Sequence, residues 1–127
     1  GFVVEKDGAH KNEFDLKARA LMPLVDAARM LALKGGRIDL VSTTARLQWA
    51  ASEHARHAPL LRSTAKAFTR LLTYRARASR DQHSSGRFLR PDTLDPYDRQ
   101  VLKQCFPPIE ELQQVIRVQF GTNLLPS

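Results

Sequence analysis

Apolar residues recur every three or four positions along most of the chain, which is the spacing of an amphipathic α-helix. The clearest such run extends from Leu16 to Lys34, with Asp15 ahead of it as an N-cap and two glycines behind it as a stop signal. Between Leu21 and Leu33, apolar residues cover nearly every side of the run. It therefore predicts a central helix that is buried over most of its surface.

Two more helices are expected in the middle of the chain. The hydroxyl residues at positions 42–44 offer N-caps for a second helix that ends near His54. Pro59 suits the first turn of a third helix, whose apolar residues keep helical spacing to about Ala78. The polar segment 79–93 contains a glycine and a proline, and it predicts a loop.

The last apolar stripe continues across two consecutive prolines, Pro107 and Pro108. Its start is marked by Asp95 as an N-cap and by Pro96 at the first helical position. A proline inside a helix costs about 3 kcal/mol or more, yet the apolar spacing stays in phase on both sides of the pair. We therefore expect a last helix that is kinked or split at these prolines.

Together these elements predict an all-α fold, a bundle of four main antiparallel helices. A chain of 127 residues with 43% hydrophobic content is long enough for one core. The β-prone start and its Asp7-Gly8 turn predict a short extended N-terminal arm over residues 1–15, so the helical domain covers residues 16–127. Because the chain opens without methionine and in mid-pattern, we interpret it as a fragment of a longer multidomain polypeptide.

The excess of positive charge indicates that an anionic partner is plausible. Twenty basic residues against 13 acidic ones give a formal charge of +7, and arginine is the main base. Its planar fork suits phosphate and carboxylate groups, as in nucleotides, nucleic acid or acidic protein surfaces. Cys105 is the only cysteine, which excludes an internal disulfide and fits the cytoplasm. No apolar run approaches the roughly 20 residues that cross a bilayer, so no membrane association is expected.

A few charges lie where the pattern expects apolar residues. Asp26 and Arg29 are three positions apart on the first helix, so they can pair. A structural ion pair and a ligand-facing role both remain open for them. Arg75 continues the apolar stripe of the third helix and, with Arg77, makes the end of that helix strongly basic. These arginines either complement the helix C-terminus or bind phosphate or carboxylate.

Catalytic and metal sites are not expected in this chain. His54 and His57 have a spacing that could hold a metal, but no further ligand is suggested nearby. The acidic run 92–98 is better explained by helix capping. The chain also lacks a glycine-rich phosphate loop and a recognisable nucleophile motif. The sequence therefore predicts no metal site and no catalytic residue of its own.

Three stretches of the sequence together resemble one family: FDLKARALMPLVDAARMLAL, STTARL and RPDTLDPYDRQVLKQCFPPIEELQQVIRVQF. It is the nucleotidyltransferase substrate-binding domain, domain-of-unknown-function family 294, C-terminal part. Proteins of this family usually carry cyclic-nucleotide-binding-like or CBS regulatory domains and a nucleotidyltransferase domain. They are similar to bacterial uridylyltransferases that modify the PII signalling protein, so the resemblance implies a role in signal transduction.

The resemblance also implies a set of polar residues for a substrate- or interface-binding surface. These candidates are Asp15, Lys17, Arg29, Arg46, Arg75, Arg77 and Arg99, and Asp26 is added to them because of its spacing to Arg29. Asp26 is expected to orient Arg29, and the last motif also includes Lys103 and Gln113. Two features depart from the family pattern, namely Ser79 in place of the usual glutamine and the proline pair in the last helix.

The implied function is acceptor positioning opposite a nucleotidyltransferase catalytic domain in the same chain. Mg²⁺ and a nucleoside triphosphate are implied for that parent enzyme, and no cofactor is expected in this fragment. The expected partner is a nucleotide or an acceptor protein. A basic helical module for acidic proteins or nucleic acid is an alternative, although no recognition helix or base-stacking aromatic set is evident. A bundle that forms a homodimer through its first or last helix is another.

Overall fold

The structure is a computed structural model that describes residues 2–120. The first helix begins with a widened π-helical turn, η1 (Lys17–Leu21), and continues as α1 (Met22–Lys34). The other α-helices are α2 (Thr43–Glu53), α3 (Ala58–Gln82), α4 (Pro96–Lys103) and α5 (Phe106–Phe120). The short elements are β1 (Phe14–Asp15), η2 (Ala55–His57), β2 (Phe88–Leu89) and η3 (Pro91–Thr93). The all-α prediction is confirmed, because the sheet among the described residues consists only of β1 and β2, two residues each.

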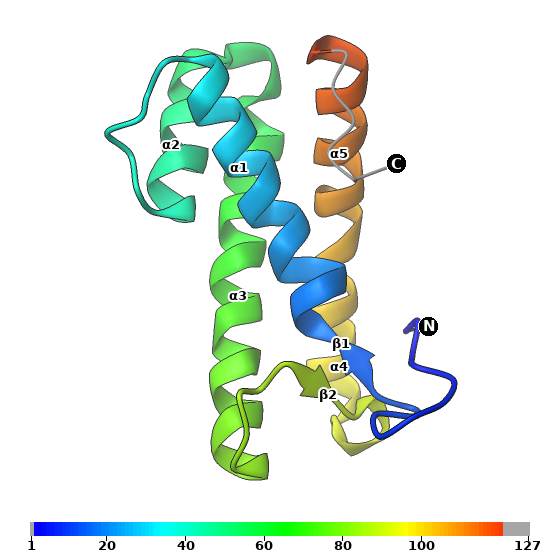
Figure 1. Ribbon diagram of the computed structural model, residues 1–127. Helices are drawn as coiled ribbons and strands as arrows, with labels where there is room; N and C mark the ends of the chain where they lie inside the picture. Colours follow the sequence, from blue (N-terminus) through cyan, green and yellow to red (C-terminus); the bar gives the residue numbers. More distant parts are fainter. Residues whose placement is uncertain (1, 121–127) are drawn as a thin grey trace.

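Helix α3 is the longest element and runs the length of the bundle (Figure 1). It packs against α2 and α5, and its direction is opposite to that of α1, α2 and α5 (Figure 1). All four main helices contribute fully buried side chains, among them Leu24, Leu47, Leu61, Leu71, Leu112 and Ile116. Since burying one such side chain is worth about 1.5–3 kcal/mol, this shared core holds the bundle together.

The helix starts that the sequence predicts are confirmed by side-chain caps. Asp15, Ser42 and Asp95 each accept a hydrogen bond from the backbone N–H three residues further on, at 2.7–3.0 Å. Each cap satisfies a donor that the first helical turn leaves without a partner, which is worth about 1 kcal/mol.

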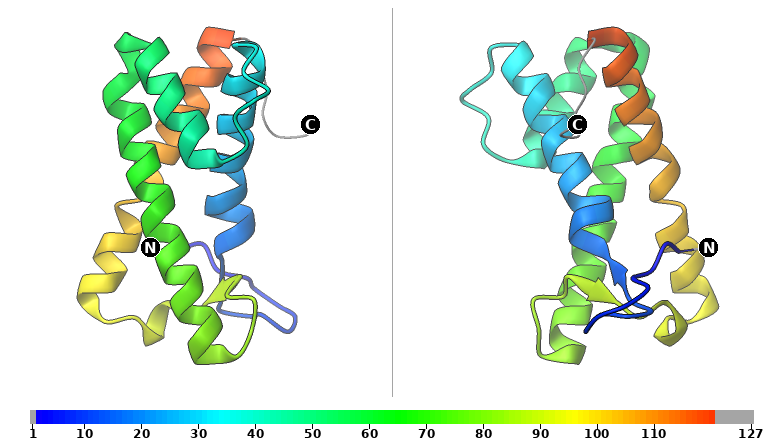
Figure 2. Two further views of the ribbon diagram at one scale, coloured as in Figure 1. Left: turned by 90° about the vertical axis from the view of Figure 1, so that its left-hand side faces the viewer. Right: turned by 45° about the vertical axis from the view of Figure 1, so that its right-hand side comes forward.

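The last helix is split, as expected, and Figure 2 shows the bend between α4 and α5. The break falls at Gln104 and Cys105, just before the prolines. Pro107 and Pro108 therefore lie in the first turn of α5, where a missing N–H costs little. Leu102 on one side and Ile109 on the other are both buried, so the two parts present one apolar face to the core.

The first helix is less buried than the sequence predicts. Leu24 and Leu31 are buried on its inner side, but Met22 and Met30 are only half-buried and Leu33 is 57% exposed. The prediction of a helix buried on most sides is therefore wrong. The reason is that α2 and α5 pack on the inner side of α1, and among the described residues nothing covers its far end on the outer side.

This helix also starts with a widened turn. In η1 the N–H of Met22 donates to the carbonyl of Lys17, five residues back instead of the usual four. Pro23 supplies the physical reason. It has no N–H to offer the carbonyl of Arg19, and its ring would crowd that oxygen in a regular α-helix. The wider turn makes room for the proline ring.

Segment 79–93 is more ordered than the predicted loop. Helix α3 continues through it as far as Gln82, four residues beyond the predicted end at Ala78. Gly86 then approaches the backbone of α3 at Arg75 with a φ of +76°, and the chain returns as β2. Strand β2 pairs antiparallel with β1, which attaches this segment to the start of the first helix.

No helix within residues 2–120 is long and apolar enough to cross a bilayer.

Candidate functional site

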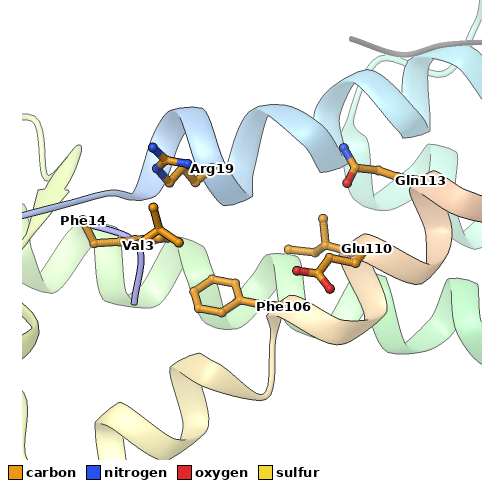
Figure 3. Close-up of a pocket in the computed structure, with 7 residues that line it drawn as sticks. Val3, Phe14, Arg19, Phe106, Glu110 and Gln113 are labelled. Carbon is orange, nitrogen blue, oxygen red and sulfur yellow. The ribbon is translucent and has the colours of Figure 1, made fainter. Parts of the chain in front are cut away.

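A groove of about 240 Å³ lies between the N-terminal arm, the first helix and α5 (Figure 3). We call it the arm groove. Its lining residues are Val3, Phe14, Arg19, Phe106, Ile109, Glu110 and Gln113. They combine an apolar floor with a cation, a carboxylate and an amide. A concave apolar surface with a few polar groups is the usual form of a ligand site, so this groove is the candidate functional site.

Three phenylalanine rings fix the arm against α5, and two of them, Phe14 and Phe106, line the groove. The ring centroids are 5.5 Å apart between Phe2 and Phe14, 5.9 Å between Phe2 and Phe106, and 5.3 Å between Phe14 and Phe106. Aromatic pairs in such tilted or edge-on arrangements are worth about 0.5–1.5 kcal/mol beyond their burial. The arm is therefore part of the domain's own packing, and it closes one side of the groove.

Arg19 is placed by the widened turn at the start of the first helix. It lies within η1, and Figure 3 shows it on the wall of the groove opposite α5. Its one ion pair among residues 2–120 is with Glu5 of the arm, at a distance of 3.8 Å. Both side chains are more than one-third exposed, and exposed pairs contribute only about 0–1 kcal/mol. The guanidinium group can therefore exchange this partner for a ligand at little cost.

Glu110 and Gln113 form the polar part of the opposite wall. They are three residues apart on α5, so their side chains lie on the same face of that helix (Figure 3). Glu110 is exposed and Gln113 is half-buried. A carboxylate accepts hydrogen bonds, and an amide both donates and accepts them. With Arg19 on the facing wall, the groove can bind an anionic group and hydrogen-bond a hydroxyl or amine of the same ligand.

Sequence reasoning missed most of this site. Gln113 was included only through its place in the last motif, and Arg19 and Glu110 were not candidates. Arg19 lies inside the first motif, but nothing in the helical spacing distinguishes it from other exposed residues of the first helix. Pro23, four residues further on, could have indicated the widened turn in which Arg19 lies, but not the arm and α5 that complete the groove.

Asp15 has a structural role in the described residues. Its carboxylate is buried and receives two hydrogen bonds from the guanidinium group of Arg87, at 3.0 and 2.8 Å, besides capping the first helix. The hydrogen bonds from Arg87 hold the pKa of Asp15 below its usual value, although burial acts in the opposite direction. Asp15 thus ties the strand before the first helix to the strand after α3.

Arg75 and Arg77 also hold segments of this chain together. The Nε of Arg75 donates to the carbonyl of Ser85, at 3.1 Å, and this bond holds the turn after α3. Arg77 donates to Asp98 of α4 at 2.8 Å, and its guanidinium group lies 5.0 Å from the ring centre of Tyr74. The basic end of α3 is therefore largely used within the domain.

Arg46 and Arg99 bind backbone carbonyls. Arg46 donates through Nε to Leu40, at 2.9 Å, which fixes the loop between α1 and α2. Arg99 donates to Pro91 at 2.7 Å, while its own Nε is buried without a hydrogen-bond partner in the described part of the chain. Both side chains are half-buried, and each holds a connecting segment against a helix.

The expected pair of Asp26 and Arg29 does not form. Neither residue makes an ion pair or a hydrogen bond with any other of residues 2–120, and Arg29 is exposed. Solvation explains the outcome, because an exposed pair three residues apart gains too little to hold two long side chains together. The idea that Asp26 orients Arg29 is therefore wrong for this structure. Lys17 is likewise exposed and unpaired among these residues.

Tyr74 links α3 to α4 and gives a pH-dependent test of that contact. Its hydroxyl donates to Asp98 at 2.9 Å. Burial and this hydrogen bond raise the pKa of Tyr74 to about 12. Because the folded state favours the neutral phenol, its contribution is complete below the unfolded pKa of about 10 and is lost as the pH rises through 12.

We expect Tyr74→Phe to lower the free energy of unfolding at pH 7 by about 1–2 kcal/mol, since Asp98 loses a buried donor. Tyr97→Phe is the control, because Tyr97 is exposed. Denaturant unfolding at a series of pH values from 7 to 12 measures both effects. The difference between wild type and Tyr74→Phe should shrink above about pH 10. Equal losses for the two variants would contradict the role given to this contact.

The histidines and the acidic run do not gather into a metal site. Within residues 2–120, no three side chains of His, Cys, Asp or Glu are placed to hold a metal ion. The Nε2 of His57 lies 2.9 Å from the Oε1 of Gln119, and the ring of His54 packs edge-on near Trp49. Asp95 caps α4, as the sequence predicts.

These features define an all-α binding domain, in which most of the candidate arginines hold the fold and the arm groove offers polar groups to a ligand. The family model described as "Putative nucleotidyltransferase substrate binding domain" matches residues 1–120. The chain belongs to this family, and the resemblance inferred from the three motifs is confirmed. No curated protein and no solved structure matches the chain.

Proposed function

We propose that this domain positions the acceptor substrate for nucleotidyl transfer, and that the acceptor binds in the arm groove. The observation that carries the proposal is the convergence of Arg19, Glu110 and Gln113 on one apolar hollow (Figure 3). Family membership supports the class of function, because the family is described as substrate-binding. The weak pairing of Arg19, whose partner Glu5 is also exposed, supports it further, because unlike the structural arginines Arg19 can turn to a ligand at little cost.

In this proposal the chain supplies binding and orientation, and a nucleotidyltransferase domain in the same polypeptide supplies the reacting groups. Mg²⁺ and the reacting nucleoside triphosphate would be held by that catalytic domain. Holding the acceptor beside the nucleotide replaces a collision between two molecules by a reaction within one complex. Such positioning can lower the barrier by roughly 7–11 kcal/mol at best.

The groove favours an acceptor with both apolar and polar parts. Arg19 can form paired hydrogen bonds with a carboxylate or a phosphate. Glu110 and Gln113 can bind a hydroxyl or an amine. A loop of an acceptor protein has all of these groups, and we propose a signalling protein as the acceptor, as in uridylyltransferase-like systems of the bacterial cytoplasm. Cys105 is buried and forms no disulfide, which is compatible with a reducing compartment.

Lys17 and Arg29 extend this proposal to the surface of the first helix. Both are exposed, and neither has a partner among residues 2–120. An unpaired exposed cation contributes little to stability, so its replacement changes the free energy of unfolding by less than about 0.5 kcal/mol. We assign these two residues to the face that meets the catalytic domain, where they would attract phosphate charge.

The test is nucleotidyl transfer by the polypeptide that joins this domain to its catalytic domain. We expect Gln113→Leu to lower kcat/KM for the acceptor about 5- to 10-fold, mainly through KM, because one polar contact is worth about 1 kcal/mol or slightly more. Gln114→Leu is the matched control, since Gln114 is exposed, bonds to Arg117 and does not line the groove. Arg29→Gln tests the proposed catalytic-domain face in the same assay.

The proposal requires the two glutamine variants to differ. Equal rates for Gln113→Leu, Gln114→Leu and the wild type would contradict acceptor binding in the arm groove. An equal loss in both variants would contradict it as well, because the effect would then follow from the change in α5 as a whole.

A further inference from the structure

The outer face of α3 carries a row of cations that the arm groove does not use. Arg62, Lys66 and Arg70 follow one another at four-residue intervals, so they lie along one side of the helix. All three are exposed, and none makes an ion pair or a hydrogen bond with another of residues 2–120. Like charges at this spacing repel each other and destabilise a helix. Stability therefore does not explain the row.

Two of these cations line a hollow of about 230 Å³ between α3 and the turn that joins α4 to α5. We call it the basic hollow. Its lining residues are Ser63, Lys66, Ala67, Arg70, Gln104, Cys105 and Pro108. Ala67 and Cys105 are short and buried, so they form a floor, and the longer Lys66 and Arg70 rise beside it. The hollow thus exists because small side chains on two helices meet beneath long cationic ones.

The polar groups that line the basic hollow are hydrogen-bond donors and cations. Its polar groups are an ammonium, a guanidinium, a hydroxyl and an amide, all of which can donate hydrogen bonds. Among residues 2–120 no carboxylate lines it, whereas Glu110 lines the arm groove and three aspartates line the hollow between α3 and α4. The N-terminus of α5 lies beside it at Pro108 and adds a positive partial charge. Every fixed charge at this site therefore favours an anion.

We infer that the basic hollow binds a phosphate-type oxyanion, such as the polyphosphate group of a nucleotide or free polyphosphate. Arg70 offers a planar fork for two oxygens of one phosphoryl group, and Lys66 offers a point charge for a neighbouring one. The volume is below the roughly 300–1,000 Å³ of sites for drug-sized ligands, so it suits phosphoryl groups and not a whole nucleotide. In the described part of the chain no residue lines both this hollow and the arm groove, so the two sites can be tested separately.

The test is titration of the chain with tripolyphosphate at low salt, followed by calorimetry and by NMR signals of the Gln104 side-chain amide and the Cys105 backbone amide. We expect saturable binding and shifts of both signals. Lys66→Gln and Arg70→Gln should each weaken binding about 10-fold or more, since a charged hydrogen bond contributes about 1.5–3 kcal/mol. Arg62→Gln removes the same charge one turn away, outside the hollow, and should weaken binding less than about 3-fold.

Titrations with two different ligands distinguish nucleotide phosphates from free polyphosphate as the source of the anion. Adenosine triphosphate that binds as tightly as tripolyphosphate assigns the hollow to nucleotide phosphates, and binding of tripolyphosphate alone assigns it to free polyphosphate. Equal weakening by all three variants would show a diffuse positive surface and would overturn the site. Absence of saturable shifts at Gln104 and Cys105 would overturn it too. All three substituted residues are exposed, and unfolding midpoints of the variants should match that of the wild type or lie slightly above it, because each substitution relieves like-charge repulsion.

Discussion

Gly86→Ala is expected to lower the free energy of unfolding by about 3–4 kcal/mol, because the new Cβ meets the backbone of α3. Gly86 has a φ of +76°, and a Cβ at this position would collide with the carbonyl oxygen of Arg75. That oxygen belongs to a helical backbone and cannot turn aside as a flexible side chain could. The segment after α3 would have to move away, and the Arg75 bond to Ser85 would weaken with it.

Gly36→Ala is the matched control for this prediction. Gly36 has a similar φ of +71°, but a Cβ there meets no atom within 4 Å. This variant therefore shows the backbone cost alone, about 1 kcal/mol. Denaturant unfolding of both variants gives the difference, which we expect to be about 2 kcal/mol or more. Equal losses would show that Gly86 is needed only for its backbone angle and not for its close approach to α3.

Asp15→Ala is expected to cost about 3–4 kcal/mol, because it removes both the helix cap and the paired hydrogen bonds to Arg87. Asp15→Asn separates the two contributions. Its amide oxygen can still cap the first helix, while the ionic pairing is lost. We expect the asparagine variant to recover about 1 kcal/mol of the loss. Denaturant unfolding at pH 7 measures the series, and equal stability of both variants with the wild type would contradict the role of Asp15.

The same residue predicts how stability depends on acid. The pKa of Asp15 is lowered by folding from a usual value of 3.8. Its contribution is therefore complete above that value and is lost as the pH falls through the lower, folded pKa. The difference between wild type and Asp15→Asn should be constant above about pH 5 and should shrink below about pH 4. A difference that persists unchanged to pH 2 would contradict the ionic pairing with Arg87.

Local rules predicted the helical framework well. Capping residues such as Ser42 and Asp95 act on donors only three positions away, so sequence alone places the start of a helix. The in-phase apolar stripe likewise predicted one buried face across Pro107 and Pro108. Burial of the first helix was overestimated, because an apolar run does not show how many neighbours will cover it.

The roles of the arginines could not be predicted in the same way. Arg77 binds Asp98, 21 positions away, and Arg87 binds Asp15, 72 positions away. Such partners become neighbours only after the chain folds, and helical periodicity contains no information about them. A cation on an apolar stripe can therefore hold a loop as easily as it can bind a ligand. The arm groove was missed for a related reason, since its walls come from three separate segments of the chain.

The proposed division between structural and ligand-binding arginines has one direct test, a comparison of Arg19→Gln with Arg77→Gln in the polypeptide that includes the catalytic domain. Stability and nucleotidyl transfer are measured on the same preparations, with rates expressed per folded molecule. We expect Arg19→Gln to lower kcat/KM for the acceptor about 10-fold and to leave stability within about 0.5 kcal/mol. Arg77→Gln should lower stability by about 1–2 kcal/mol and leave the rate unchanged. The opposite pattern, with transfer lost in Arg77→Gln and retained in Arg19→Gln, would contradict the account.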